Sequence, residues 1–295
     1  MSSGGGVAVG IHLGMLEELL KHFPALRFDF VAGCSGGGWA GAVYCIDPTR
    51  IGIEMAIKDY LALEAKDLFG RFYKITSTAK NIAWRISGNS VRSFLSGKKY
   101  MKFLESYFGN VKMNELDVPL ALVGHDINFH TELIFGDAGE RFKKSSFPLF
   151  SLAEAVYVTS AQPLYIPPLL ANNGNNWVDG GITTSLPVDI VRAADVDDMW
   201  VFAANSSNRP AGKIRGLDDI IIETVDSMVG FNLRLALESL QVPDGIKTHI
   251  LYGDDFPDTE EFLDFFDKSE ELVEYGRKTM RDYLANPQPV NLRRL

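Results

Sequence analysis

The chain has 295 residues, of which 46% are hydrophobic and 23% charged, and a formal net charge of −9. These values are typical of a globular protein with a large core, and the negative charge argues against nucleic acid as a partner. The two cysteines do not indicate a disulfide scaffold, no apolar run is long enough to span a bilayer, and the first residues lack the features of a signal peptide. We therefore expect a cytoplasmic protein whose only contact with membranes would be peripheral.

No linker rich in proline, serine or glycine divides the sequence, so we expect one domain over residues 1–295. Charge is unevenly distributed along it. Residues 66–102 contain nine basic side chains and one acidic one, whereas residues 254–274 contain ten acidic side chains and one lysine. Such a distribution can mark a surface for a charged partner, but a solvated face is the more frequent explanation.

A glycine run opens the chain, at Gly4, Gly5 and Gly6, and leads into residues 11–22, where leucines recur at helical spacing. Successive glycine N–H groups before a helix suit a phosphate or a developing oxyanion. The run does not match a nucleotide-binding fingerprint, because it lacks the G-x-G-x-x-G register, a Walker lysine and a preceding strand. A flexible glycine tail is the alternative interpretation of this stretch.

The next motif is a short apolar strand, residues 28–34, that ends in the pattern G-x-S-x-G at Gly33, Ser35 and Gly37. This is the pattern of a nucleophile elbow, in which a serine occupies a sharp turn from strand to helix. The turn strains the serine backbone and closes only when its neighbours are nearly bare. The N-terminal end of the following helix would lie beside the hydroxyl. Taken alone, the pattern fits a plain glycine turn equally well.

The rest of the chain alternates expected helices and buried strands. In chain order we expect a helix over 51–63, strands over 118–123 and 132–135, a helix over 152–158, a helix from 186 onward, strands over 199–204 and 249–252, and a final helix over 266–284. This alternation indicates an α/β fold, a three-layer α/β/α sandwich with a mostly parallel central sheet. We find no internal repeat.

A third motif, Asp179-Gly180-Gly181, follows the apolar pair at residues 177–178. Three motifs now stand in a fixed order along the chain: the glycine run followed by His12-x-Gly14, then G-x-S-x-G, then D-G-G. Together they resemble the motifs of the patatin-like phospholipase family. The likeness covers almost the whole chain. It extends to a P-strand-D segment at 119–126, an S-A-x-P turn at 160–163, an L-P-V at 186–188 and a closing helix at 269–284.

The resemblance implies a serine acyl hydrolase that uses a Ser–Asp dyad, with Ser35 as the nucleophile and Asp179 as the base. The resemblance also implies an oxyanion hole formed by the backbone N–H groups of Gly4, Gly5, Gly6 and Val7. The elbow and D-G-G glycines that would let the backbone approach the ester are Gly33, Gly37, Gly180 and Gly181. An aspartate gains basicity for this task only when it is partly desolvated. No cofactor and no metal ion are implied.

A histidine is the usual base for a serine nucleophile, so four of the five histidines are alternatives to Asp179. His12 lies in the first expected helix, His125 at a strand end, His130 in a turn and His249 at the start of a late strand. None follows the nucleophile in the order expected of an α/β-hydrolase triad. We interpret them as structural.

The sequence departs from the family pattern at two places. The family carries Arg or Lys and then Gly after G-G-G-x, and Ala8 and Val9 stand there instead. Any role of that basic side chain in shaping the loop or binding an anionic head group is therefore in doubt. The family's strand before the glycine run is also missing, since residues 1–3 are too short and too polar for one. From this second departure we expect either that the chain has been trimmed at its N-terminus or that the glycine loop is held less firmly than usual.

The substrate implied by the resemblance is a fatty acyl ester of a glycerolipid, cleaved by a phospholipase A or lysophospholipase reaction. Two stretches suit a lipid interface: residues 141–150 interleave basic and aromatic residues, and residues 66–107 would form a basic, aromatic cap or lid beside the acyl channel. An ordinary surface loop and a packed helix are the alternatives. An acyltransferase and a catalytically weak storage or interaction protein remain alternative functions.

Overall fold

The computed structural model describes residues 1–70, 93, 95–136, 146–147, 149–204, 217–242, 244–253 and 263–287. Most of the basic and aromatic stretch at 141–150 lies outside these residues, as do residues 71–92 of the expected cap. Residues 254–262 of the acidic stretch also lie outside them.

The described helices are α1 (Ala8–His22), α2 (Ser35–Ile46), α3 (Arg50–Ala62), α4 (Ala65–Phe69), α6 (Gly97–Phe108), α7 (Leu152–Thr159), α8 (Val188–Arg192), α9 (Leu217–Ser239) and α10 (Ser269–Ala285), with short 3₁₀ turns η2 (Met113–Glu115) and η4 (Gly180–Ile182). The described strands are β1 (Val31–Cys34), β2 (Leu120–Asp126), β3 (Thr131–Phe135), β4 (Ser146–Phe147), β5 (Leu169–Leu170), β6 (Asn176–Asp179), β7 (Asp198–Ala204) and β8 (Lys247–Gly253).

The strand β2 organises the larger part of the sheet. The order is β4-β3-β2-β6-β5, and β1 also pairs with β2. Because β3 occupies one edge of β2 from Leu122 to Asp126, β1 and β6 share the other edge. β1 runs parallel to β2 along its first half, and β6 runs antiparallel along its second half.

The first three residues lie between β1 and β7, in the position of a strand. Ser2 bridges in parallel to both Gly33 and Phe202, and its N–H donates to the Ala32 carbonyl at 2.9 Å. The expectation that residues 1–3 are too short and too polar for this position is therefore wrong. The polar side chains fit because backbone groups satisfy them: the Ser2 hydroxyl, for example, donates to the Gly37 carbonyl at 2.8 Å.

This segment connects the pair β7-β8 to the larger sheet. From one edge inward, the order is β8, β7, residues 1–3, β1 and β2. Each of these neighbours runs parallel to the next. The antiparallel pairings are those of β2 with β3, β2 with β6 and β5 with β6. The mostly parallel central sheet expected from the sequence is confirmed, within a mixed sheet.

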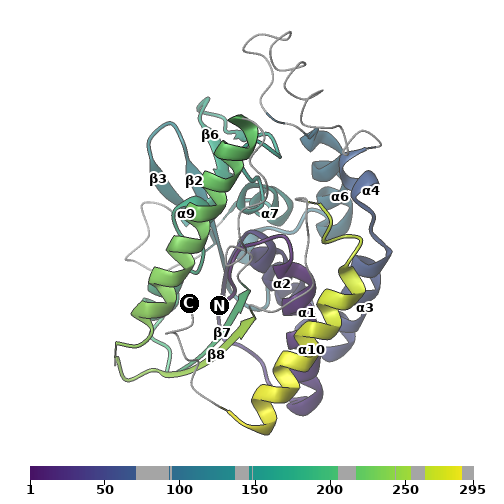
Figure 1. Cartoon of the computed structure of the whole chain (residues 1–295), viewed down its shortest axis with the longest axis vertical. Coiled ribbons are helices and arrows are strands. Elements are labelled where there is room, and N and C mark those ends of the chain that lie inside the picture. Colours follow the sequence, from purple (N-terminus) through teal and green to yellow (C-terminus); the bar gives the residue numbers. More distant parts are fainter. Residues whose placement is uncertain are drawn as a thin grey trace.

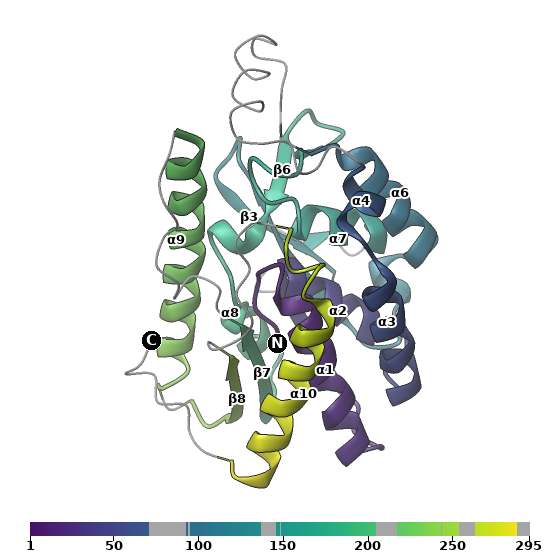
Figure 2. The ribbon, with the colours of Figure 1, turned by 45° about the vertical axis from the view of Figure 1, so that its right-hand side comes forward.

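Helices cover the two faces of the sheet (Figures 1 and 2). Buried side chains of α1, α2, α3, α6, α7 and α10 form one hydrophobic cluster, and those of α8 and α9 form the second with the opposite face of β1, β2 and β7. Neighbouring strand residues alternate between the clusters, as Val31 and Ala32 of β1 do. The three-layer α/β sandwich is confirmed.

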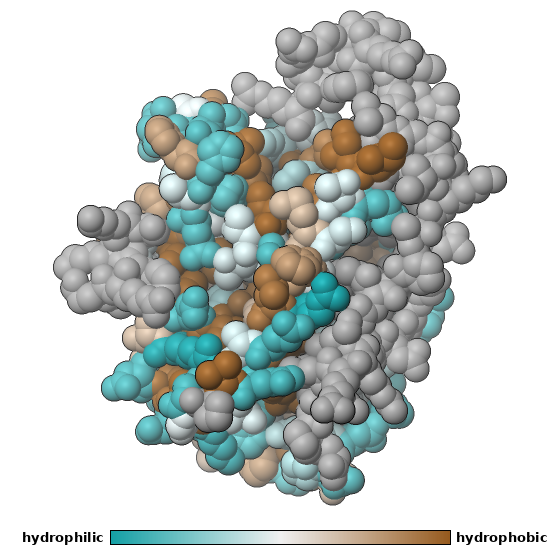
Figure 3. All heavy atoms as spheres, turned by 60° about the vertical axis from the view of Figure 1, so that its left-hand side comes forward, coloured by the Kyte–Doolittle hydropathy of each residue, from teal (hydrophilic) through white to brown (hydrophobic). Residues whose placement is uncertain are grey.

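The outer face of α9 carries exposed apolar side chains. Ile220, Met228, Phe231 and Leu235 lie on one side of the helix by their spacing, and between 46% and 51% of each is exposed. Figure 3 shows this side of the molecule, where apolar residues lie between hydrophilic ones. In the part of the chain that the structure describes, no helix is long and apolar enough to cross a membrane.

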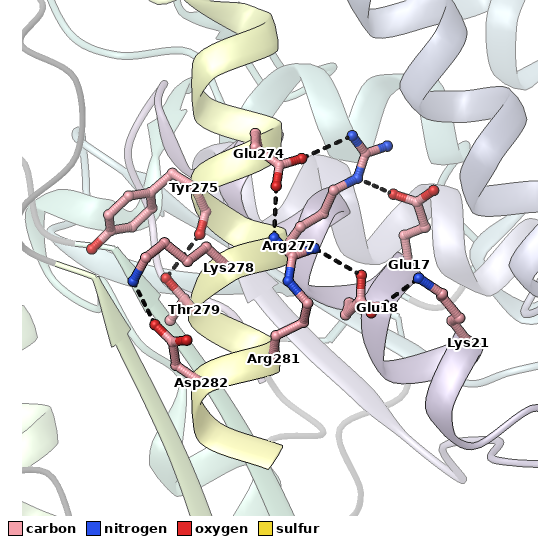
Figure 4. A network of polar contacts seen from close by, with 10 residues as sticks. All are labelled: Glu17, Glu18, Lys21, Glu274, Tyr275, Arg277, Lys278, Thr279, Arg281 and Asp282. Atoms are coloured by element: carbon pink, nitrogen blue, oxygen red, sulfur yellow. Dashed lines mark hydrogen bonds and ion pairs between the residues drawn. The ribbon is translucent and has the colours of Figure 1, made fainter. Parts of the chain in front are cut away.

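α1 and α10 pack closely against each other on the opposite layer (Figure 2). A Cβ on Gly14 would lie 2.1 Å from the Val273 carbonyl oxygen, and one on Gly276 would lie 2.0 Å from that of Ile11, so both helices need glycine where they cross. Figure 4 shows the polar contacts that flank this crossing, including an ion pair of 2.5 Å between Arg277 Nε and Glu17 Oε2.

Candidate active site

The register of the sheet brings the two predicted catalytic residues together. Cys34, the last residue of β1, lies opposite Val123, and Asp179, the last residue of β6, lies opposite Gly124. β1 and β6 run in opposite directions along the same edge of β2, so their carboxyl ends meet at two consecutive residues of that strand. Ser35 follows Cys34 directly and therefore lies beside Asp179.

Ser35 has the backbone conformation that a nucleophile elbow requires. Its φ is +51°, in the left-handed region that residues other than glycine rarely adopt. The turn closes against bare backbone: a Cβ on Gly37 would lie 2.2 Å from the Ser3 carbonyl oxygen, and one on Gly33 would lie 2.8 Å from the Cα of Gly38. The helix α2 begins at Ser35, which places the positive end of the helix dipole at this residue.

Asp179 is a buried carboxylate with two hydrogen-bond donors. Its Oδ1 accepts from the Gly181 N–H at 2.8 Å and from the Cys34 thiol at 3.6 Å. Burial raises the pKa of Asp179 to about 6, because desolvation disfavours the charged form more than Gly181, Ser35 and Cys34 together favour it. The side chain can therefore take up a proton near neutral pH.

A hydroxyl that the sequence analysis did not select lies behind the elbow. Thr159 Oγ1 accepts a hydrogen bond from the Ser35 N–H at 2.9 Å and donates one to the Val123 carbonyl at 2.6 Å. Its position just before the S-A-x-P turn at 160–163 was a signal that this segment approaches the site, but nothing in the sequence indicated which side chain reaches the elbow.

The glycine run lies against the elbow, as expected. A Cβ on Gly4 would lie 3.3 Å from the Ser35 Cβ, and Gly5 has a φ of +116° that favours glycine. The Gly4 N–H already donates to the Ser185 carbonyl at 3.0 Å, so this predicted oxyanion donor is occupied. The N–H groups of Gly5, Gly6 and Val7 have no hydrogen-bond partner within the described residues.

The D-G-G motif forms a tight turn at the end of β6. A Cβ on Gly180 would lie 2.7 Å from the backbone of Val123, and one on Gly181 would lie 3.1 Å from Asp179 Oδ1. The Ser185 Oγ lies 3.0 and 2.8 Å from the carbonyl oxygens of Gly181 and Val229, between which its single hydrogen is shared. The glycines thus let the aspartate approach β2 and receive the Gly181 N–H.

A cavity of about 80 Å³ lies beside Ser35. Apolar side chains dominate its lining, and several come from α4 and α6, the described ends of the expected cap. They are Val9, Trp39, Leu63, Leu68, Phe69, Phe103, Ile166, Leu263, Phe265 and Phe266. Gly6 and Gly36 also line the cavity, so the glycine run and the elbow both border this apolar space.

Three of the histidines have surroundings that are buried for His12 and His125 and aromatic for His249. His12 is fully buried, and desolvation lowers its pKa to about 3. Burial also lowers the pKa of His125. His249 Nδ1 lies 2.6 Å from the hydroxyl of Tyr283 on α10, and its ring stacks on Trp200. Across the described ranges, no group of three or more His, Cys, Asp or Glu side chains is arranged to hold a metal ion.

A serine hydroxyl held on a strained turn, next to a carboxylate that can accept its proton, is an arrangement of serine acyl hydrolases. Comparison with known proteins gives the family. The model of the patatin-like phospholipase family matches residues 1–192. The chain therefore belongs to the patatin-like phospholipase family.

Curated relatives match at low identity. The chain is 24% identical over 193 residues to neuropathy target esterase sws of Drosophila melanogaster, which covers 64% of this chain and 11% of that protein. It is 24% identical over 231 residues to lysophospholipase NTE1 of Saccharomyces cerevisiae, which covers 77% of this chain and 11% of that protein. The chain thus matches about a tenth of the length of these relatives.

Among solved structures, VipD from Legionella pneumophila aligns with 95% of this chain and 66% of its own chain. The TM-score is 0.43 and the sequence identity 12%.

Proposed function

We propose that this chain is a lipid acyl-ester hydrolase of the phospholipase A or lysophospholipase type. The observation that carries the proposal is the position of the strained Ser35 beside the buried Asp179, at the edge of an apolar cavity. Membership of the patatin-like phospholipase family and the lysophospholipase among the relatives support a lipid substrate. The cavity lining suits a fatty acyl group.

In the proposed reaction, Ser35 Oγ attacks the ester carbonyl carbon while Asp179 accepts the hydroxyl proton. The carbonyl oxygen becomes an oxyanion, to which the N–H groups of Gly5, Gly6 and Val7 would donate. Collapse of this intermediate expels the alcohol, which takes the proton from Asp179, and leaves an acyl group on Ser35. Water activated by Asp179 then releases the fatty acid and restores the serine.

The acyl chain requires more room than the cavity provides. Its volume of about 80 Å³ is below the roughly 300–1,000 Å³ of typical ligand pockets. The Phe265 ring lies directly over Gly6, where an added Cβ would come within 2.5 Å of it. We propose that substrate entry displaces Phe265 from Gly6 and so opens the cavity next to the glycine run.

The decisive experiment is labelling with an alkyl fluorophosphonate, followed by mass spectrometry of the labelled peptide. Wild-type protein should carry the label on Ser35, and Ser35→Ala should carry none. Ser35→Ala and Asp179→Asn should both lose hydrolysis of lysophosphatidylcholine. Ser227→Ala, which changes an exposed serine on α9, is the matched control and should keep wild-type labelling.

Hydrolysis that persists in Ser35→Ala would refute the proposal. The same preparations also test the alternative of an acyltransferase. An alcohol can attack the acyl-enzyme in place of water, and the acyl group is then transferred to it. Products measured with and without added monoacylglycerol separate hydrolysis from acyl transfer. A wild-type protein that neither takes the label nor turns over ester would favour a storage or interaction role on this fold.

A further inference from the structure

The last residue of α7 connects the elbow to the sheet. Thr159 is completely buried, and its side chain reaches the backbone of Ser35 and that of Val123. The three residues come from α7, from the start of α2 and from β2, which are distant in sequence. The hydroxyl thus joins three elements at the point where β1 gives way to α2.

The direction of both hydrogen bonds follows from the chemistry of the groups. A hydroxyl carries one hydrogen, and the Val123 carbonyl can only accept, so Thr159 donates its hydrogen there at 2.6 Å. The Ser35 N–H can only donate, so it bonds to the lone pair of the same oxygen at 2.9 Å. Such a chain of bonds in a buried setting strengthens each member.

The Ser35 N–H depends on this contact. Ser35 is the first residue of α2, and the first N–H groups of a helix have no partner within the helix. Its φ of +51° is a strained backbone conformation for serine and persists only where the surroundings fix it. The bond to Thr159 holds the peptide plane before Ser35 in the orientation that this conformation needs.

The methyl group of Thr159 has a separate contact. A Cβ on Gly38 would lie 3.0 Å from Thr159 Cγ2, so the methyl group packs against α2 one turn after the elbow. The hydroxyl and the methyl group can therefore be removed independently: valine keeps a methyl group at this site and serine keeps the hydroxyl.

We propose that Thr159 is a positioning residue, whose hydroxyl holds Ser35 in the conformation that directs its Oγ toward Asp179. This inference rests on the proposed function, in which Ser35 is the nucleophile. The inference adds that the Ser35 N–H donates to Thr159 and is therefore not available to stabilise an oxyanion. Thr159 itself does not contact the reacting atoms.

The test compares Thr159→Val and Thr159→Ser with wild-type protein. Displacement of a reacting group by about 1 Å can cost on the order of 100-fold in rate. We expect Thr159→Val to lower both kcat and the rate of fluorophosphonate labelling by about 10- to 100-fold, with KM within about threefold of the wild-type value. Thr159→Ser should restore both rates to within about threefold.

The matched control is Thr279→Val on α10, which removes a hydroxyl that donates to the Tyr275 carbonyl, away from the elbow (Figure 4). It should keep the wild-type rates. Wild-type rates in Thr159→Val would overturn the proposal. It would also be overturned if Thr159→Ser lost as much activity as Thr159→Val, because the methyl group would then be the decisive part.

Amide hydrogen exchange at Ser35 gives a readout that does not depend on turnover. The proposal predicts slow exchange in wild-type protein and in Thr159→Ser, and exchange at least about tenfold faster in Thr159→Val. Fast exchange in wild-type protein overturns it, even if the valine variant does not fold. If wild-type protein fails to label at Ser35 but this amide is protected through Thr159, the proposed function fails while the positioning contact stands.

Discussion

At the scale of single residues, the raised pKa of Asp179 is the main electrostatic feature of the site. Its carboxylate is buried, and the neighbouring groups Gly181, Ser35 and Cys34 offset only part of the effect of desolvation on its pKa. A free aspartate with its ordinary pKa is a weak base for a hydroxyl, whereas one with a pKa near 6 approaches the range where proton transfer is efficient at neutral pH.

The pH dependence of hydrolysis follows from this pKa. Asp179 must be deprotonated to accept the serine proton, so kcat/KM should be low at acidic pH, rise through about pH 6 and level off above it. The measurement is kcat/KM for a soluble, uncharged ester between pH 4 and pH 9. An acidic limb near pH 4, the range of an ordinary aspartate, would show that the carboxylate is not desolvated in solution.

The sequence motifs selected the proposed nucleophile and base but not the groups that hold them. Ser35 and Asp179 belong to short motifs with a local steric signature, which is why a sequence pattern can find them. Thr159 and the occupied N–H of Gly4 depend on hydrogen bonds between segments that are far apart in the chain. No local pattern encodes such contacts.

At the scale of elements, the packing of α10 on α1 depends on both glycines and ion pairs. Arg277 pairs with Glu17 of α1, and the two side chains are 29% and 16% exposed. Lys278 pairs with Asp282 on α10 itself, where both side chains are more than 60% exposed. A partly buried pair between helices is screened less by solvent than an exposed pair within one helix.

We expect Arg277→Met to lower the free energy of unfolding by about 1 kcal/mol and Lys278→Met by less than about 0.5 kcal/mol. Urea denaturation followed by circular dichroism gives both values. Equal effects of the two substitutions would mean that the contact with Glu17 does not stabilise the pairing of the helices.

The inner side of α9 contacts the turn that follows Asp179. The Asn232 side chain donates to the Ile182 carbonyl at 2.8 Å, which attaches α9 to the turn that follows Asp179. The peripheral membrane contact expected from the sequence, if made through α9, would place the exposed apolar side chains of its outer side against the lipid. Transfer of one large apolar side chain out of water contributes roughly 1.5–3 kcal/mol.

We therefore expect Phe231→Glu to weaken binding to phosphatidylcholine vesicles by about tenfold or more. Hydrolysis of a soluble monomeric ester should be unaffected. Ser227→Glu adds the same charge to an exposed position of α9 without removing an apolar group, and it is the control. Vesicle binding by sedimentation decides the matter, and equal binding of Phe231→Glu and wild-type protein would exclude α9 as the contact.

The type and order of most elements followed from the sequence, whereas their pairing did not. Alternating apolar runs and helical spacing are local properties and predicted the sandwich. The antiparallel approach of β6 to β2, and the use of residues 1–3 between β1 and β7, depend on which backbone edges remain open after the other strands have paired. The polar composition of residues 1–3 argued against a position inside the sheet. They can lie there because backbone carbonyl groups accept hydrogen bonds from the two serine hydroxyls.

At the scale of the whole molecule, the layers are joined through the centre of the sheet. Residues 1–3 hydrogen-bond to β1 on one side and to β7 on the other, so the two parts of the sheet meet beside the elbow. The hydrophobic clusters on both faces share these strands. Unfolding of either part therefore removes support from the site.

With that arrangement, the reactivity proposed for Ser35 depends on the whole sheet being folded. Cys34, directly before Ser35, and Asp179 lie opposite consecutive residues of β2, so the proposed nucleophile and base are held together by the pairing of β1 and β6 with that strand. We expect urea to abolish fluorophosphonate labelling and far-ultraviolet ellipticity at the same midpoint concentration. A folded, unreactive species at intermediate urea would instead reveal that the glycine loop melts first.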